Sequence, residues 1–219
     1  MLDANSLFSE EQGGFRSGRR CADQQLVLAE AIKSNARRGR QTFCAFMDVR
    51  KAFPSVFHKA MLQRLHQKIS EAPGGDSHKC SKTWRVIEHM YSSCKSHVSI
   101  GGQKSDEYLV EQGIREGSVL SPVLFAIFID DIVRRLNGCQ GTTVGGVRVK
   151  VLLYADDIVL ISENAQDLQC MIDICQKFAD ESSFQFSKEK SHVIVFGDQI
   201  DHPYEWTLNG DIMTEALRT

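Results

Sequence analysis

The stretch Val151–Ile161 constrains the fold most, because two adjacent acids, Asp156 and Asp157, interrupt an otherwise unbroken apolar run. Short runs of β-branched and large apolar residues on both sides predict two buried strands joined by a tight turn. Neighbouring carboxylates repel each other, and each loses hydration near a core unless a cation neutralises it. Either a hard divalent cation such as Mg²⁺ or Mn²⁺ binds here, or the pair lies in a solvated hairpin turn without a function.

The composition is that of a globular protein with a core: of 219 residues, 42% are hydrophobic and 25% are charged. The 26 basic and 28 acidic side chains give a formal net charge of −2, so a nucleic acid would have to be held by local patches. One basic patch is visible between Arg16 and Arg40. No apolar run reaches the roughly 18 to 20 residues of a membrane span, and no signal peptide opens the chain. We therefore expect no membrane contact and an intracellular location, which the sequence does not resolve into nucleus or cytoplasm.

The seven cysteines have no regular spacing and form no C-x-x-C pair. This pattern is weak evidence for either a disulfide framework or a zinc site. We therefore expect all seven to be reduced thiols of an intracellular protein.

The order of the predicted elements indicates an α+β fold. Helices are expected over 24–38 (capped by Asp23), 58–69, 82–94, 122–137 and 165–180. Strands are expected over 42–48, near 96–101 and 107–112, on both sides of the Asp156–Asp157 turn, and before Phe196, with a hairpin over 206–212 and a loop over 72–77. Such an order predicts a mainly antiparallel sheet with helices packed on one face.

Asp48 ends the strand predicted over 42–48, where a single acid is more often a helix cap than a catalyst. If this strand lies beside the hairpin, however, Asp48 converges with Asp156 and Asp157. Three clustered carboxylates need neutralisation, and two divalent ions about 3.5 to 4 Å apart are the usual solution in polymerases and nucleases. A lysine late in the chain would then neutralise or protonate a departing pyrophosphate, and Lys190 is the best-placed candidate.

Two blocks, Tyr154-Ala155-Asp156-Asp157 and Phe46-Met47-Asp48-Val49-Arg50-Lys51-Ala52-Phe53, resemble the palm of a reverse transcriptase. The resemblance is strongest to the non-LTR retrotransposon type and weaker to group II introns. Four further blocks follow the family's order, namely residues 12–24, 112–122, 187–191 and 208–210. The resemblance covers nearly the whole chain. It implies a right-hand polymerase palm over 41–219, interrupted by a fingers-like excursion at about 70–112, with partial fingers over 1–40 and no thumb.

The resemblance also implies a function and a set of residues. The function is RNA-directed DNA polymerase, which adds dNTPs to the 3′-hydroxyl of a DNA primer on an RNA template with two Mg²⁺ or Mn²⁺ ions. The resemblance assigns metal binding to Asp48, Asp156, Asp157 and the Val49 carbonyl. It assigns neutralisation or protonation of the pyrophosphate to Lys190. Phe53 matches the aromatic steric gate that excludes a 2′-hydroxyl, although it is alternatively an ordinary core side chain. Contacts with nucleotide or template fall to Gln112, Gly113, Arg16 and Tyr154.

Some features depart from the family pattern. Pro54 stands where relatives usually have Asp, and Ser187 where many have Asn. We expect the upstream fingers block, the primer grip and the thumb to be absent, which predicts a fragment with weak or no activity alone. Two alternatives stay open: a catalytically inactive reverse-transcriptase-like scaffold that binds RNA or protein, and a two-metal nuclease. The three retained acids favour the polymerase over the scaffold, and the nuclease gives no account of Phe53 or the Gln112 loop.

Overall fold

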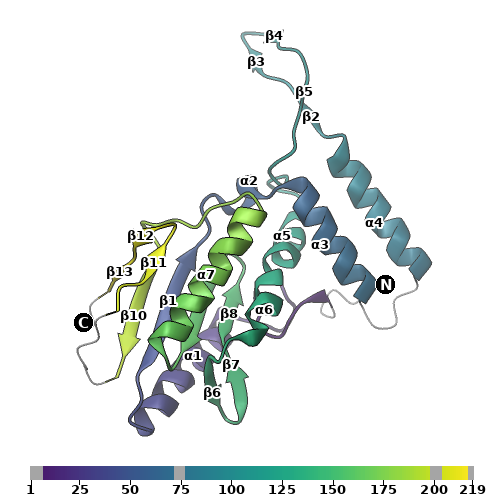
Figure 1. Cartoon of the computed structure of the whole chain (residues 1–219). Coiled ribbons are helices and arrows are strands. Elements are labelled where there is room, and N and C mark those ends of the chain that lie inside the picture. Colours follow the sequence, from purple (N-terminus) through teal and green to yellow (C-terminus); the bar gives the residue numbers. More distant parts are fainter. Residues whose placement is uncertain (1–6, 72–76, 198–203, 217–219) are drawn as a thin grey trace.

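The computed structural model describes residues 7–71, 77–197 and 204–216 (Figure 1). The loop predicted over 72–77 lies almost entirely outside these ranges. The helices are α1 (Cys21–Arg37), α2 (Ala52–Ser55), α3 (His58–Glu71), α4 (Ser77–Ser92), α5 (Ser121–Ile129), α6 (Asp131–Arg135) and α7 (Ala165–Glu181), with a 3₁₀ turn at Leu136–Gly138. The strands are β1 (Thr42–Asp48), β2 (Lys95–Ser96), β3 (Ser99–Ile100), β4 (Gln103–Lys104), β5 (Tyr108–Leu109), β6 (Thr142–Val144), β7 (Val147–Val149), β8 (Val151–Tyr154), β9 (Asp157–Ser162), β10 (His192–Phe196), β11 (Thr207–Leu208), β12 (Asp211–Ile212) and β13 (Thr214–Glu215).

The central sheet has five strands in the order β13-β10-β1-β9-β8. Strand β1 lies in the middle and pairs antiparallel with both β9 and β10, and β8 pairs antiparallel with β9. The short β13 joins β10 in parallel. Strand β1 is almost entirely apolar and buried on both faces, as expected for a central strand covered from two sides. The predicted antiparallel α+β fold is therefore confirmed.

Most of the core lies between the sheet and the helices α5, α6 and α7, which pass in front of the sheet in Figure 1. Helix α7 turns an apolar stripe inward, including Met171, Ile172 and Phe178. The rings of Phe128 and Phe184 lie 5.8 Å and 5.5 Å from that of Phe178, within the usual range for aromatic pairs. Helix α1 packs against the opposite face of the sheet through a smaller cluster of Ala31, Cys44, Leu152 and Ile161.

The helix predicted over 122–137 is broken, and that prediction was wrong in its continuity. Helix α5 ends at Ile129, and a tighter bond from Val133 N–H to the Asp130 carbonyl starts α6. The Asp130 side chain is fully buried and accepts hydrogen bonds from the backbone N–H and hydroxyl of Ser9. Lys68 also pairs with it. These partners are distant in sequence, so a local apolar stripe does not reveal the break.

Two predicted strands are shorter than expected, and two predicted helices begin earlier. The strands near 96–101 and 107–112 reduce to two-residue pieces, with β2 paired to β5 and β3 to β4, on a hairpin that projects from the body at the top of Figure 1. Helix α1 starts at Cys21, and the Asp23 carboxylate accepts from the Arg20 N–H at 2.8 Å, so Asp23 caps from inside the first turn. Helix α4 likewise begins at Ser77 rather than near 82.

Two further hairpins have turns whose residues suit the positive φ angles found there. The predicted hairpin over 206–212 is confirmed as β11–β12, with Asn209 and Gly210 both at positive φ in the turn, as a two-residue type I′ loop requires. The glycine-rich stretch before Val151 contains a second hairpin, β6–β7, with Gly145 and Gly146 at positive φ in its turn.

Candidate active site

Three acids lie at one end of the central sheet. Strand β1 ends at Asp48 and β9 begins at Asp157, and the two residues face each other directly in the β1–β9 register. Asp156 precedes Asp157 in the two-residue turn that joins β8 to β9, and Tyr154 pairs with Asp157 across that turn. The sequence placed both Asp156 and Asp157 in the turn, whereas the structure assigns Asp157 to the strand. Side chains of facing residues in a pair of strands project to the same side of the sheet, so Asp48 and Asp157 are neighbours.

The charges of these acids interact. Burial raises the pKa of Asp157 above its ordinary value, and the negative charges of Asp156 and Asp48 raise it further. The Lys190 charge acts in the opposite direction. The Lys190 ammonium lies 3.5 Å from Oδ2 of Asp48, and its side chain is 70% exposed. Three carboxylates opposed by one exposed lysine attract cations.

The chain segment before β10 fixes the backbone of Asp48. The Ser187 N–H donates to the Asp48 carbonyl at 2.8 Å, and the Asp48 N–H donates to the Ser191 hydroxyl at 3.2 Å. One residue on, the Arg50 N–H donates to the Gln185 carbonyl. None of these bonds uses the Val49 carbonyl, which lies between them in the sequence. The sequence indicated neither serine as part of this support, although Ser187 was noted as a departure from the family pattern.

The residues fit a divalent cation in chemistry, because carboxylate and carbonyl oxygens are the ligands that Mg²⁺ and Mn²⁺ prefer. Within the described residues, however, no three carboxylate, imidazole or thiol groups already stand in ligand geometry. The strands bring Asp48 and Asp157 side by side, and Asp156 is next to Asp157 in the chain.

Phe53, Gln112 and Gly113 meet around α2, just beyond Asp48. The Phe53 ring is half-buried and packs on Phe125 at 5.5 Å, and its carbonyl accepts from the Ile114 N–H. The Gly113 N–H donates to the Val56 carbonyl, and its φ of 94° favours glycine. The Gln112 side chain is exposed and donates to the Ser55 carbonyl at 2.9 Å. The structure therefore brings these three predicted residues together: Gln112 and Gly113, from the segment between β5 and α5, lie against the segment that follows β1 and carries Phe53.

Arg16 occupies a different environment from the one predicted. Its side chain is 6% exposed, and Nη1 donates to the carbonyls of Ser9 and Gln12 at 2.8 Å and 3.0 Å. Its Nη2 lies 3.4 Å from Glu10. The guanidinium thus holds the residues around it, and the template or triphosphate contact that the resemblance implies stays a prediction.

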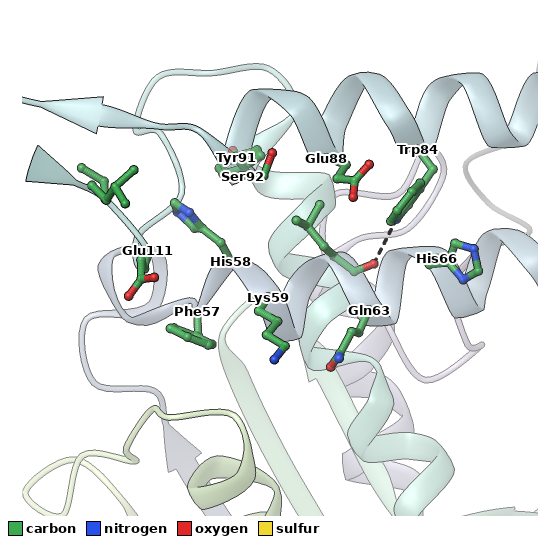
Figure 2. Close-up of a pocket in the computed structure, with 13 residues that line it drawn as sticks. Phe57, His58, Lys59, Gln63, His66, Trp84, Glu88, Tyr91, Ser92 and Glu111 are labelled. Carbon is green, nitrogen blue, oxygen red and sulfur yellow. Dashed lines mark hydrogen bonds between the residues drawn. The ribbon is translucent and has the colours of Figure 1, made fainter.

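Two cavities differ in their relation to these residues. One of about 320 Å³ is lined by Asp48, Asp157, Tyr154 and Lys190 together with apolar residues of α1 and the sheet. A larger one of about 590 Å³ lies between α3, α4 and residues 109–111 (Figure 2). Its lining includes Trp84, whose indole N–H donates to the Leu62 carbonyl, but none of the predicted site residues. A third cavity, of about 680 Å³, is larger than both and has Gln112 in its lining, together with Arg50 and Ser55.

Two further predictions concern the whole chain. The six cysteines whose side chains are described are free thiols, as predicted. In the part of the chain that the structure describes, no helix combines the length and the apolar character needed to cross a membrane.

Comparison with known proteins agrees with this geometry. A family model described as reverse transcriptase (RNA-dependent DNA polymerase) matches residues 1–209. The chain is 27% identical to the Pol polyprotein of retrotransposable element R2 from Nasonia vitripennis, covering 89% of this chain and 18% of that protein. It is 26% identical to the RNA-directed DNA polymerase from mobile element jockey of Drosophila funebris, covering 94% of this chain and 22% of that protein.

The fold is also similar to that of apo telomerase from Candida tropicalis, with a TM-score of 0.62 and 13% identity over 93% of this chain and 37% of that one. The chain thus spans about a fifth of the length of the retrotransposon relatives. The sequence blocks, the arrangement of the three acids and the family match agree: this chain belongs to the reverse transcriptase family of RNA-dependent DNA polymerases.

Proposed function

We propose that this chain carries the catalytic core of an RNA-directed DNA polymerase. The observation that supports this most directly is the pairing of Asp48 with Asp157 at adjacent strand ends, with Asp156 in the connecting turn and Lys190 3.5 Å from Asp48. The reaction joins the 3′-oxygen of a DNA primer to the α-phosphorus of a dNTP on an RNA template. The bond to the β-phosphate breaks, and pyrophosphate leaves.

Each residue has one role in this proposal. Asp48, Asp156 and Asp157, with the Val49 carbonyl, would hold two divalent ions, Mg²⁺ or Mn²⁺. Those ions would supply activation of the 3′-hydroxyl and stabilisation of charge on the leaving phosphates. The exposed side chain of Lys190 reaches the phosphate side and neutralises or protonates the departing pyrophosphate.

The segment after β1, together with the residues that lie beside it, would recognise the nucleotide. Phe53 is held by Phe125 and by the bond from Ile114, so its ring has a fixed position against which the sugar packs. A fixed ring leaves no room for a 2′-hydroxyl and selects deoxynucleotides. Gln112 and Gly113 contact the incoming nucleotide or template, and Tyr154 lies beside the acids. In this proposal residues 1–40 are partial fingers and 41–219 are palm, with a fingers-like excursion at about 70–112.

Primer extension on poly(rA)/oligo(dT) with dTTP and Mg²⁺ or Mn²⁺ tests the activity. Since weak extension is expected of this chain alone, the assay uses a high protein concentration. Removing a group that stabilises transition-state charge lowers rates by about 10²–10³-fold, so whatever extension the wild type shows should fall by at least that factor in Asp156→Ala. Asp180→Asn removes an exposed carboxylate of α7 and serves as the matched control. Extension that survives Asp156→Ala would refute the site.

Metal binding supplies a second readout that does not depend on activity. Titration with Mn²⁺ followed by electron paramagnetic resonance should show binding by the wild type and its loss in Asp48→Asn. A wild-type chain that binds no Mn²⁺ at millimolar concentration would contradict the proposed metal site even if the fold is intact.

A further inference from the structure

A segment near the N-terminus lies directly against the catalytic turn. The Leu153 N–H donates to the Glu11 carbonyl at 3.0 Å, and the Gly13 N–H donates to the Leu153 carbonyl at 2.8 Å. These bonds pair Gln12 with Leu153 in parallel, along the outer side of β8. Residues 11–13 therefore run beside β8 to the point where the turn bearing Asp156 begins.

The Gln12 side chain reaches into that turn. It is completely buried, and its Oε1 accepts one hydrogen bond from the Gly14 N–H at 2.8 Å and a second from the Ala155 N–H at 3.2 Å. Ala155 is the residue immediately before Asp156 and has a φ of 59°, a conformation that residues other than glycine rarely adopt. A strained turn residue persists only when its surroundings fix it, and the Gln12 oxygen is one such constraint.

Gly14 allows this contact because it has no side chain. A Cβ on Gly14 would lie 2.2 Å from the Ala155 nitrogen and 2.9 Å from its Cα, and both are backbone atoms that cannot rotate away. A Cβ on neighbouring Gly13 would meet the tip of Gln24 at 2.8 Å, which is a flexible side chain. The two glycines therefore differ: one is required by the turn, and the other has a neighbour that can move.

The segment is itself held in place, so that it can transmit a constraint. The buried Arg16 guanidinium donates to the Ser9 and Gln12 carbonyls on both sides of the 10–11 dipeptide. The Gln24 side chain donates to the Glu11 carbonyl at 3.1 Å from helix α1. The backbone that presents Gln12 is thus tied to β8, to Arg16 and to α1.

From these contacts we propose that Gln12 is a positioning residue for metal binding: its amide oxygen holds the Ala155 N–H and thereby sets where the Asp156 carboxylate stands. The inference rests on the proposed function, in which Asp156 is a metal ligand. Groups that orient ligands from behind commonly change metal affinity by about 10–100-fold when they are lost. Gln12 has the same kind of role here, acting through one backbone N–H rather than through a ligand side chain.

The competing explanation is that Gln12 merely fastens the N-terminal segment, and a matched control separates the two. Gln12→Met keeps the length of the side chain and removes the acceptor. Asn35→Leu makes the same kind of change elsewhere, because Asn35 is a fully buried amide of α1 that bonds to Thr42 and Thr142. Both variants should lower the unfolding midpoint, so stability alone does not distinguish them.

Two measurements on the whole chain do distinguish them. Amide hydrogen exchange at Ala155 should accelerate at least tenfold in Gln12→Met and stay unchanged in Asn35→Leu. The Kd for Mn²⁺ of the folded protein should rise about tenfold or more in Gln12→Met and remain within twofold of wild type in Asn35→Leu. If Gln12→Met lowers stability but leaves both the Ala155 exchange rate and the Mn²⁺ Kd unchanged, the positioning role is refuted.

A second pair of variants covers the case in which Gln12→Met does not fold. Gly14→Ala should displace the turn and weaken Mn²⁺ binding, whereas Gly138→Ala, whose Cβ would meet nothing within 4 Å, should leave it within twofold. Equal effects of the two glycine variants would count against the proposal. If the wild type itself binds no Mn²⁺, the proposed function fails, and the Ala155 exchange rate in the same variants still decides whether Gln12 holds the turn.

Discussion

The buried ion cluster between α3, α6 and α7 gives a stability prediction whose size follows from its contacts. Asp131, 6% exposed, accepts hydrogen bonds from Arg134 at 2.7 Å and Arg135 at 3.0 Å, and Nε of Arg64 lies 3.4 Å from it. The Arg64 side chain is only 12% exposed, and its guanidinium carbon lies about 5 Å from the ring centres of Phe128 and Phe178. Asp131→Asn removes the charge that compensates Arg64.

The magnitude depends on which arginine loses its partner. Arg134 is more than half exposed, and Arg135 keeps an ion pair with Glu181 at 2.7 Å, so water or Glu181 still compensates both. Among the described residues, Asp131 is the one carboxylate in ion-pair contact with Arg64. Breaking a buried pair costs about 3–5 kcal/mol, and a single uncompensated charge places Asp131→Asn near the lower end, about 3 kcal/mol. For a chain of this size that corresponds to a fall in Tm of roughly 6–12 °C.

Urea unfolding monitored by circular dichroism measures this loss. Asp180→Asn makes the same chemical change at an exposed carboxylate and should shift the free energy of unfolding by no more than about 0.5 kcal/mol. Replacing Arg64 by Met in the Asp131→Asn background should recover part of the loss, because the uncompensated charge is then gone. A loss below about 1 kcal/mol for Asp131→Asn would refute the argument.

The difference in unfolding free energy between wild type and Asp131→Asn should depend on pH with a definite sign. Burial acts to raise the pKa of Asp131, but the hydrogen bonds from Arg135 and Arg134 outweigh it and hold the pKa below the ordinary value of 3.8. A lowered folded pKa stabilises the folded state above the unfolded pKa, and this contribution is lost as the pH falls through the folded pKa. The gap between wild type and Asp131→Asn should therefore be constant near neutral pH and narrow only in acid.

Three further predictions follow. Asp157→Asn should raise the Tm in metal-free buffer at neutral pH, because burial and the charges of Asp156 and Asp48 raise the folded pKa of Asp157. The gain in Tm should shrink as the pH falls through that raised pKa, and a gain that stays constant would contradict the prediction. Phe53→Ala should increase ribonucleotide relative to deoxynucleotide incorporation, and an unchanged ratio would exclude the gate. Gly141→Ala should lower the urea midpoint more than Gly145→Ala: both positions have positive φ, but only at Gly141 would a Cβ meet a backbone oxygen, at 2.4 Å.

Elements with strong local periodicity could be predicted from the sequence almost to the residue. Strand β1 has the predicted bounds, and α7 and the hairpin around Asp156 differ by only a residue or two, because each is specified by its own apolar pattern. The break at Asp130 could not be predicted in this way, since the groups that satisfy its carboxylate, Ser9 and Lys68, come from other parts of the chain.

In the candidate site, too, the sequence identifies some residues but not the contacts between distant parts of the chain. The acids could be named from the sequence, but their adjacency depends on the register of β1 against β9, which no local pattern encodes. The support of Asp48 by Ser187 and Ser191 and of Ala155 by Gln12 consists of single hydrogen bonds between distant polar residues. The adjacent glycines at 13 and 14 are a local sign that another part of the chain approaches closely, but they do not identify that part.

The pairing of residues 11–13 with β8 also bears on how the sheet meets other molecules. Strand β8 is the last strand in the order of the central sheet, so without a neighbour its outer N–H and C=O groups would be open to pairing with another chain. Glu11 and Gly13 occupy those groups of Leu153. Residues 11–13 therefore cover this strand edge against edge-to-edge aggregation and also support the turn. Their displacement would open the edge beside Asp156 and Asp157 to self-association, at a rate that depends on protein concentration.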